Sequence, residues 1–258
     1  MRTELYHQTH SVQATHWWMR SRRKLSIELL TRFGVPAGCR HLDIGCGPGQ
    51  NLDLLDRFHP SQVVGIDVSP IALELARKEH PQADLIRANV NNPLPFGDAA
   101  FDVATILGVV CSEWVESDVA VLREVKRILK PNGLLLITEP AFPALFREMD
   151  VIGMVKRRYR LGQFADMMRS AGLDVLLSSY FTSVGAPIIL AMKAMKAAAS
   201  KKPDTGDVSE TGDVPDLRPM HPWLNAAAYG AARVEASLIK ARIPIPFGTT
   251  IICVARRK

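Results

Sequence analysis

A glycine-rich turn that directly follows a short apolar strand is the feature that most constrains the fold of this chain. The sequence reads LDIGCGPG over residues 42–49. Glycine lacks a Cβ atom, so such a segment can turn sharply and expose main-chain amides to a ligand at the start of a helix. In open parallel sheets that place is the carboxyl edge of the strands, where ligands bind. The turn therefore predicts an α/β fold with a ligand site at this segment.

Short apolar runs alternate with segments of helical periodicity from residue 40 onward. This alternation is typical of a doubly wound parallel sheet that is covered by helices on both faces. Ser69 and Pro70 suit the cap and first turn of one of the helices. The other expected helices between strands are 50–58, 118–129 and 163–170. The expected strands are 41–44, 63–67, 84–88, 101–107, 134–138, 174–180 and 249–255.

The stretch before the last expected strand departs from this pattern. Residues 201–219 are rich in Asp, Gly, Thr, Ser and Pro, a composition that predicts a mobile linker. We expect helices at 187–199 and 223–241 to form a lid or an interface, and packing on the sheet is an equally open alternative. The expected domains are an N-terminal helical cover at 1–38, a core at 39–182, a helical insertion at 183–248 and a closing strand at 249–258.

The composition is that of a folded globular protein. Hydrophobic residues make up 47% and charged residues 22% of the 258 residues, which suffices for one large core. We expect no spanning helix, because no window holds the roughly 18 uninterrupted apolar residues that one requires. The polar N-terminus predicts no secretory signal. None of the four cysteines forms a C-x-x-C pair, which predicts reduced thiols and a cytoplasmic location.

The basic residues predict a solvated surface rather than a nucleic-acid site. The formal net charge of +6 comes from small clusters, and no basic stripe interleaved with aromatic residues accompanies it. Neutral imidazoles at the spacing of His7, His10 and His16 can bind zinc or copper. We expect no metal site, because no paired carboxylate or cysteine lies nearby in sequence. The expected partner is a small molecule, and the chain is expected to be a monomer or a homodimer.

An acidic residue at the end of the second expected strand identifies the class of ligand. Asp67 lies 18 residues beyond Gly49, where a carboxylate can accept two hydrogen bonds from ribose hydroxyls. A nicotinamide dinucleotide requires a third glycine where this chain has Gln50. Asp43 would repel a pyrophosphate, whereas it suits the cationic methionine end of S-adenosylmethionine. Charge therefore favours S-adenosylmethionine as the cofactor.

Three segments in order, LDIGCGPG at 42–49, VGID at 64–67 and LKPNG at 129–133, resemble the class I S-adenosylmethionine-dependent methyltransferases. The resemblance covers about residues 40–182 and the last strand. It implies a Rossmann-like, seven-stranded sheet whose last strand is antiparallel. It also implies a transferase that methylates a small molecule, with biosynthesis as the expected setting.

The resemblance implies a set of cofactor contacts in the core. Aspartate is common in relatives where Asn89 stands, and the asparagine carbonyl can still accept from the adenine amino group. The glycine turn would cradle the methionine end, Asp67 would hold the ribose, and Val68 would lie on the adenine. The implied contacts are Asp43, Gly45, Cys46, Gly47, Asp67, Val68, Asn89, Val90, Leu107 and Gly108.

A narrower resemblance, to a branch of these enzymes, rests on HWWMR at 16–20, RRY at 157–159 and PFG at 246–248. In that branch an N-terminal helix covers the cofactor pocket. The resemblance implies that Trp17 or Trp18 stacks there and that Arg20 or Arg23 meets the cofactor carboxylate, a task that suits arginine. The alternative is that the tryptophans anchor the helix to the core and the arginines are solvated.

Catalysis requires little side-chain chemistry, because the sulfonium already carries an activated leaving group. If the acceptor is an acid such as a phenol or enol, a general base helps. The turn after the fourth strand carries Cys111-Ser112 where many relatives place an acidic residue and a histidine, so the family's catalytic roles do not transfer directly. The candidate bases are His7, His16, Glu113 and Tyr159, and the candidate substrate contacts are Tyr6, Arg158, Tyr159 and Tyr180.

Three functions remain open on the sequence alone. The first is a small-molecule methyltransferase. The second is an enzyme that cyclises or cleaves S-adenosylmethionine and releases methylthioadenosine without methylating an acceptor. The third is a cofactor-binding partner protein without catalysis. The motifs favour the first.

Overall fold

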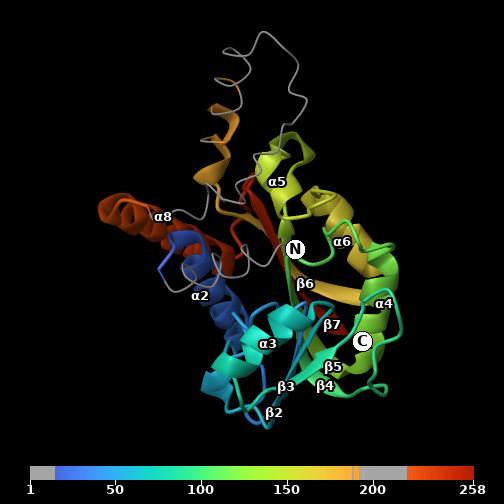
Figure 1. Ribbon diagram of the computed structural model, residues 1–258. Helices are drawn as coiled ribbons and strands as arrows, with labels where there is room; N and C mark the ends of the chain where they lie inside the picture. The colour runs from blue at the N-terminus through green and yellow to red at the C-terminus, as the bar shows by residue number, and fades with distance from the viewer. Residues whose placement is uncertain (1–14, 188, 192–193, 195–219) are drawn as a thin grey trace.

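The computed structural model of this chain describes residues 15–187, 189–191, 194 and 220–258. Its centre is one seven-stranded sheet in the order β3-β2-β1-β4-β5-β7-β6 (Figure 1). Neighbouring strands from β3 to β5 pair in parallel, and β7 runs antiparallel to β5 and β6. The strands are β1 Arg40–Ile44, β2 Gln62–Asp67, β3 Asp84–Arg87, β4 Phe101–Leu107, β5 Leu129–Pro140, β6 Leu173–Phe181 and β7 Thr250–Arg257. The Rossmann-like sheet with an antiparallel last strand is confirmed.

Helices cover both faces of the sheet, and each face has its own buried apolar cluster (Figure 1). Helices α2, α3 and α8 lie on one face, and α4 and α6 lie on the other. The bounds are α2 Trp17–Arg32, α3 Pro70–Glu79, α4 Asp118–Ile128, α5 Glu148–Ile152, α6 Leu161–Ser170 and α8 Pro222–Lys240. Short 3-10 turns occur at Asp56–Phe58 and Pro143–Leu145.

The sequence signals for helix starts work as expected. The hydroxyl of Ser69 accepts a hydrogen bond from the amide of Ala72, and Pro70 occupies the first turn of α3. The hydroxyl of Ser117 caps α4 in the same way, on the amide of Ala120. Both caps satisfy amides that no helical carbonyl reaches.

The prediction of a helix at 50–58 is wrong. The segment forms tight turns, in which the amide of Leu52 donates to the carbonyl of Gly49 at 3.1 Å, and only its end is a 3-10 turn. A tertiary contact competes with the helix, because Arg23 of α2 donates to the carbonyl of Gln50 and to the Asp53 carboxylate. Gly49 has φ +93, which no α-helix continues.

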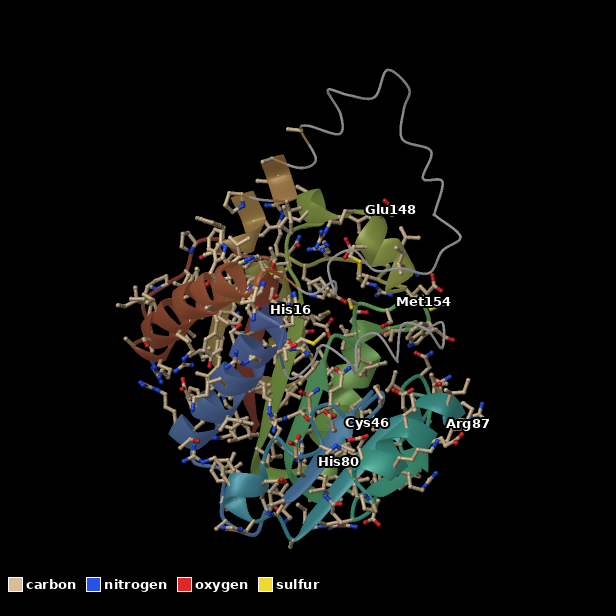
Figure 2. All side chains as sticks on the ribbon, turned by 60° about the vertical axis from the view of Figure 1, so that its left-hand side comes forward. His16, Cys46, His80, Arg87, Glu148 and Met154 are labelled. Atoms are coloured by element: carbon tan, nitrogen blue, oxygen red, sulfur yellow. The ribbon has the colours of Figure 1, made fainter. Side chains whose placement is uncertain are left out.

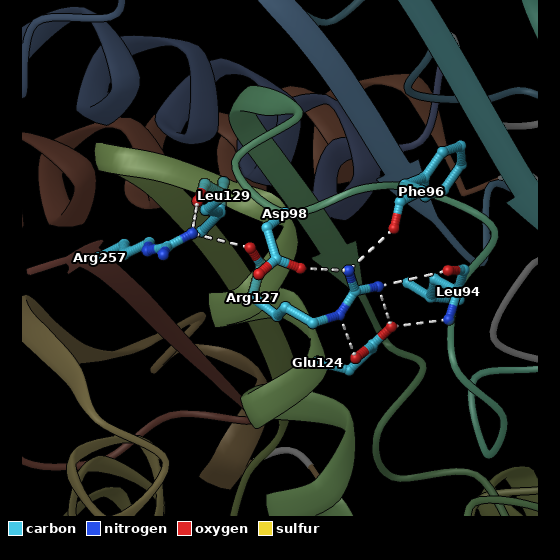
Figure 3. A network of polar contacts seen from close by, with 7 residues as sticks. All are labelled: Leu94, Phe96, Asp98, Glu124, Arg127, Leu129 and Arg257. Carbon is cyan, nitrogen blue, oxygen red and sulfur yellow. Dashed lines mark hydrogen bonds and ion pairs between the residues drawn. The ribbon is translucent and has the colours of Figure 1, made fainter.

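A polar network fastens the long loop between β3 and β4 to helix α4 (Figure 3). The Arg127 guanidinium donates to the carbonyls of Leu94 and Phe96 and to the carboxylates of Asp98 and Glu124. One guanidinium thus holds four acceptors along the loop and the helix in a fixed geometry. The loop begins with residues 88–90, which belong to the pocket described below.

The N-terminal helix and the helix of the predicted insertion form one layer. Glu28 of α2 pairs with Arg233 at 2.6 Å and Lys240 at 2.9 Å, both on α8. The side-chain oxygen of Asn225, Oδ1, accepts from the main-chain amide of Trp17 at 2.8 Å, at the start of α2. Figure 1 shows the two helices side by side. The predicted linker at 201–219 and most of the helix predicted at 187–199 lie outside the described residues.

Among the residues that the structure describes, no helix combines the length and apolar character needed to cross a membrane.

Candidate cofactor-binding site

A pocket lies at the carboxyl edge of the parallel strands, next to the point where the strand order reverses between β1 and β4. Open α/β sheets bind ligands at such a switch point. The residues after four neighbouring strands meet there, which brings distant parts of the sequence together. Six of the predicted cofactor contacts line the pocket: Gly45, Asp67, Val68, Asn89, Val90 and Gly108.

The glycine turn has a backbone that other residues would strain. Gly45, Gly47 and Gly49 have φ angles of +69°, +53° and +93°. A Cβ atom at Gly45 would also lie 2.3 Å from Cγ2 of Val109, which belongs to the loop after β4. Gly45 therefore permits both the turn and the close approach of the two loops that line the pocket.

Asp67 at the end of β2 is fixed by two main-chain amides. Its Oδ2 accepts from the amide of Gly47 at 2.9 Å, and its Oδ1 accepts from the amide of Ser69 at 2.8 Å. Burial raises the pKa of Asp67, and the two amides oppose that rise. Each carboxylate oxygen has a lone pair left to accept one more hydrogen bond, so the group is oriented and still able to receive two ribose hydroxyls.

Asp43 lies behind the turn and is almost completely buried, at 2% exposure. Its Oδ1 accepts from the Thr105 hydroxyl at 2.6 Å, while its Oδ2 has no hydrogen-bond partner within the part of the chain that is described. Burial raises the pKa of Asp43 to about 7, and the charge of Arg22 opposes the rise. A buried, unpaired carboxylate oxygen beside a bare glycine turn fits the cationic end of S-adenosylmethionine.

Besides Asp43 and Gly47, two further predicted core contacts, Cys46 and Leu107, lie outside the pocket lining. Cys46 is buried, packs with Leu52 and Leu73, and has a pKa that burial raises. Leu107 ends β4 and packs against the apolar cluster on the α2 face. Their cofactor contacts stay predictions that rest on the main chain rather than on these side chains.

The three arginines near the start of α2 have different surroundings, and only Arg22 interacts with the charge of Asp43. Arg20 is exposed and lies 4.4 Å over the ring of Tyr229, and Arg23 is paired with Asp53 at 2.8 Å. Arg22 instead lies 4.6 Å over the ring of Trp18. Its guanidinium feels the charges of Asp43 and Glu139, and burial lowers its pKa to about 10. The cofactor contacts of Arg20, Arg23 and Trp18 stay predictions, and in the structure the ring of Trp18 supports the Arg22 guanidinium.

Two of the four candidate bases, His16 and Tyr159, have other partners in the structure. His16 lies at the start of α2 (Figure 2), where its Nδ1 accepts from the amide of Trp18 as a helix cap. The buried Tyr159 donates its hydroxyl proton to Asp118 at 2.9 Å, and burial raises its pKa. Glu113 is exposed and its side chain does not line the pocket. His7 lies outside the described residues. A role as base stays a prediction for each.

The candidate substrate contacts are held by structural partners. Arg158 forms an ion pair with Asp150 at 2.8 Å, and both side chains are buried. The Tyr180 hydroxyl accepts from the amide of Leu161 at 3.0 Å, and its ring stacks on Phe142. Tyr159 is engaged as described above, and Tyr6 lies outside the described residues. The structure brings none of the three described candidates into the pocket lining, so substrate contact stays a prediction.

The loop after β4 supplies pocket residues that sequence reasoning missed. Val109, Ser112 and Trp114 line the pocket, and Gly153 after α5 closes the same side. The buried carboxylate of Glu139 accepts from the amides of residues 109, 110 and 111 at 3.2, 2.9 and 3.1 Å. An acidic residue within an otherwise apolar strand is the signal in the sequence that such an anchor leaves.

Two asparagines connect the loops after β3 and β4. Oδ1 of Asn89 accepts from the amide of Asn91 at 3.0 Å, so its amide nitrogen remains a donor. The Asn91 side chain donates to the carbonyl of Trp114 at 2.7 Å and accepts from the amide of Glu116 at 3.0 Å. The loop after β3 is thereby tied to the loop after β4, and both border one pocket.

The comparisons with known proteins agree with this geometry. Residues 42–137 match the family described as "Methyltransferase domain". The chain is 35% identical over 136 residues to the demethylmenaquinone methyltransferase of Tropheryma whipplei, and 32% identical over 122 residues to the trans-aconitate 2-methyltransferase of Acidovorax ebreus. These matches cover 52% and 46% of this chain, and 52% and 45% of the relatives, or about half of their length.

A longer match runs through almost the whole chain. The trans-aconitate 2-methyltransferase of Methylobacterium nodulans is 28% identical over 253 residues, which cover 92% of this chain and 93% of that protein. Among solved structures, an S-adenosylmethionine-dependent methyltransferase from Mesorhizobium loti has a TM-score of 0.57 at 18% identity, covering 89% and 96% of the two chains. Residues 42–137 therefore match the methyltransferase domain family, and the strand order of the sheet is that of the class I S-adenosylmethionine-dependent methyltransferase fold.

Proposed function

We propose that this chain is an enzyme that transfers the methyl group of S-adenosylmethionine to a small-molecule acceptor. The observation that carries the proposal is the pocket in which the glycine turn meets the oriented carboxylate of Asp67. The printed activities of the relatives support a small acceptor, since they act on trans-aconitate and demethylmenaquinone. Methylation of an acceptor is therefore favoured over cleavage or cyclisation of the cofactor.

Residues at the ends of β2 and β3 hold the nucleoside in this proposal. Asp67 accepts the ribose hydroxyls, because both of its oxygens keep lone pairs after binding the amides of Gly47 and Ser69. Val68 is exposed at the pocket and provides an apolar surface for the adenine. Asn89 accepts from the adenine amino group, because its Oδ1 keeps a lone pair after binding the amide of Asn91, and its amide nitrogen can donate to a ring nitrogen.

Groups on α2 and β1 hold the amino-acid end. Asp43 receives the ammonium group, because its Oδ2 is buried and unpaired among the described residues. Arg22 receives the carboxylate, because its charge is partly desolvated and its guanidinium has a planar geometry that matches a carboxylate. The opposite charges of Arg22 and Asp43 would thus bind the two opposite charges of an amino acid.

The remaining lining forms the acceptor side. The bound cofactor supplies an activated methyl group on a sulfonium, so the main task of the protein is to align the acceptor and exclude water. Val109, Ser112, Trp114 and Gly153 line this part of the pocket. Glu139 fixes the loop that carries three of them, through the amides that it binds. Rigid positioning of this kind is what methyl transfer requires.

The organisation of the chain supports the same proposal. We propose that the cover at 1–38 and the insertion at 183–248 act together over the core at 39–182, with 249–258 completing the sheet, because α2 and α8 are joined by the ion pairs of Glu28. The four cysteines are free and buried, which supports a reducing, cytoplasmic location. The monomer and the homodimer both accommodate this arrangement.

Product analysis tests the function directly. Purified protein is incubated with methyl-labelled S-adenosylmethionine, with and without trans-aconitate or a crude metabolite extract. We expect S-adenosylhomocysteine and a labelled small molecule only when an acceptor is present. Methylthioadenosine formed without an acceptor, or no product with any acceptor from the extract, would contradict the proposal. The Asp67→Asn protein is the control, because its cofactor grip is weakened while the acceptor side is unchanged.

A further inference from the structure

Three buried side chains form a hydrogen-bonded row inside the sheet, directly behind the pocket. His41 and Asp43 lie two residues apart on β1, so they face the same side of the sheet. Thr105 is the register partner of Asp43 on the neighbouring strand β4. The Thr105 hydroxyl oxygen lies 2.6 Å from Oδ1 of Asp43 and 2.9 Å from Nε2 of His41. All three residues are at most 2% exposed.

The row has one preferred arrangement of protons. When Asp43 is ionised, its carboxylate only accepts, so the single hydroxyl proton of Thr105 points to it. The lone pairs of the Thr105 oxygen are then free to accept from Nε2–H of His41. Burial lowers the pKa of His41 to about 3, so the imidazole is neutral and carries one proton, at Nε2. In this arrangement His41 donates to Thr105, and Thr105 donates to the carboxylate of Asp43.

The opposite arrangement is less favourable. If Asp43 were protonated and donated to Thr105, the hydroxyl would donate to Nε2 of His41 and the imidazole proton would move to Nδ1. Nδ1 of His41 is buried and has no hydrogen-bond partner in the described part of the chain. A buried unpaired N–H group is rarer in proteins than a buried acceptor with free lone pairs. His41 therefore biases the row toward an ionised Asp43.

We propose that Thr105 and His41 are positioning residues that keep Asp43 ionised and hold its Oδ2 free for the ammonium group of the cofactor. This inference rests on the proposed function, because it assigns that ammonium group to Asp43. Neither residue touches the cofactor itself. Both act through Asp43.

Other charged groups around Asp43 also affect its ionisation. Arg22 on α2 favours the ionised carboxylate, whereas Asp67 at the end of β2 disfavours it. Cys46 in the turn is a neutral thiol, because burial and the two aspartates raise its pKa. Burial raises the pKa of Asp43 to about 7 even though the Thr105 hydrogen bond and the charge of Arg22 lower it. With the Thr105 donor in place Asp43 is therefore nearly balanced between its two forms at neutral pH, and loss of the donor shifts it toward the protonated form.

The test compares two ligands and matched threonine variants by calorimetry. S-adenosylhomocysteine carries the ammonium group, and methylthioadenosine lacks the amino-acid end. Thr105→Val is nearly isosteric and removes the donor, whereas Thr105→Ser retains it. Thr138→Val is the matched control, because Thr138 is equally buried on β5 and its hydroxyl has no described hydrogen-bond partner. Thermal unfolding verifies that each variant is folded.

We expect Thr105→Val to weaken S-adenosylhomocysteine binding at pH 7 by roughly tenfold or more, the effect of a lost hydrogen bond to a charged group. Affinity should recover as the pH rises, because without the donor Asp43 ionises at higher pH. Methylthioadenosine binding, Thr105→Ser and Thr138→Val should stay within about twofold of the parent values. His41→Leu should shift the pH dependence in the same direction by a smaller amount.

Each outcome decides a separate point. If the unmodified protein binds neither S-adenosylhomocysteine nor S-adenosylmethionine, the proposed function itself fails. If it binds and Thr105→Val equals Thr138→Val, the positioning role is overturned. Equal losses for both ligands would show that Thr105 supports only the fold, which also overturns it. Infrared difference spectra provide an independent readout, because Thr105→Val should increase the protonated carboxyl signal of Asp43 at pH 7.

Discussion

Replacing Asp67 by asparagine separates the structural task of this carboxylate from its ligand task. The two oxygens of Asp67 bind two different amides, those of Gly47 and Ser69, at 2.9 and 2.8 Å. Asparagine keeps the shape but has only one acceptor oxygen. Its NH2 group must then face one of the two amide protons, so one hydrogen bond to a charged group becomes a contact between two donors.

The expected loss of stability follows from that count. A hydrogen bond to a charged group contributes about 1.5–3 kcal/mol, and one such bond is lost. Asp67 is partly accessible from the pocket and burial raises its pKa, which offsets part of the loss. We therefore expect the free energy of unfolding in urea to fall by about 1–2 kcal/mol, near the lower end of that range. The protein should remain folded.

The expected loss of ligand affinity is larger. If the carboxylate accepts both ribose hydroxyls, one or both of these bonds are lost, and each corresponds to roughly a 10- to 150-fold change in dissociation constant. Calorimetry with S-adenosylhomocysteine and its 2′-deoxy analogue forms a double-mutant cycle with Asp67→Asn. The analogue should lose less affinity on mutation, because one of the two hydroxyls that Asp67 would bind is already absent.

One result would refute this reasoning. If the folded Asp67→Asn protein bound S-adenosylhomocysteine within about twofold of the parent affinity, the ribose would not be held by this carboxylate. Asp166→Asn is the matched control, because Asp166 is exposed on α6 and pairs only with Arg169 among the described residues. It should change neither the stability nor the affinity measurably.

Three further predictions concern other groups. Arg22→Met should weaken S-adenosylhomocysteine binding by roughly 10-fold or more but leave methylthioadenosine binding unchanged, and Arg20→Met should affect neither in calorimetry. Burial raises the pKa of Glu139 to about 7, so the stability that its protonated form contributes is present below pH 4.5 and is lost as the pH rises through about 7. The free energy of unfolding should therefore fall by about 3 kcal/mol less over that range in Glu139→Gln than in the parent protein. An unchanged pH dependence would contradict this prediction. Gly248→Ala should destabilise the fold by about 2 kcal/mol or more, because its Cβ would lie 2.3 Å from the carbonyl oxygen of Phe181, whereas Gly162→Ala, which meets open space, should not lower the urea midpoint.

The parts of the site that were predictable from the sequence are those that depend on local backbone geometry. The turn at 42–49 and the acid at Asp67 follow strands whose apolar runs are unambiguous, so their meeting at one edge of the sheet follows from parallel topology. The strand at 101–107 has the predicted bounds for the same reason. These features require only short-range information and one general rule of sheet assembly.

The parts that were not predictable depend on packing between distant segments. Arg20, Arg22 and Arg23 lie within one turn of α2, and the docking of α2 on α8 and on the core decides which of them interacts with Asp43. Arg158 and Tyr159 carry the chemistry of a substrate site, yet their partners, Asp150 and Asp118, are known only from the fold. The helix expected at 50–58 was lost to Arg23 in the same way.

The position of β7 has a consequence for how the chain folds. Among the described residues, strand β6 pairs with β7 alone, and Phe181 of β6 pairs with Thr250 of β7, far along the sequence. Until β7 is synthesised and docks, β6 and the outer side of β5 are open strand edges that other chains can join. Such late, long-range pairing slows folding and leaves aggregation-prone intermediates. Expression at lower temperature or with chaperones should therefore raise the yield of soluble protein.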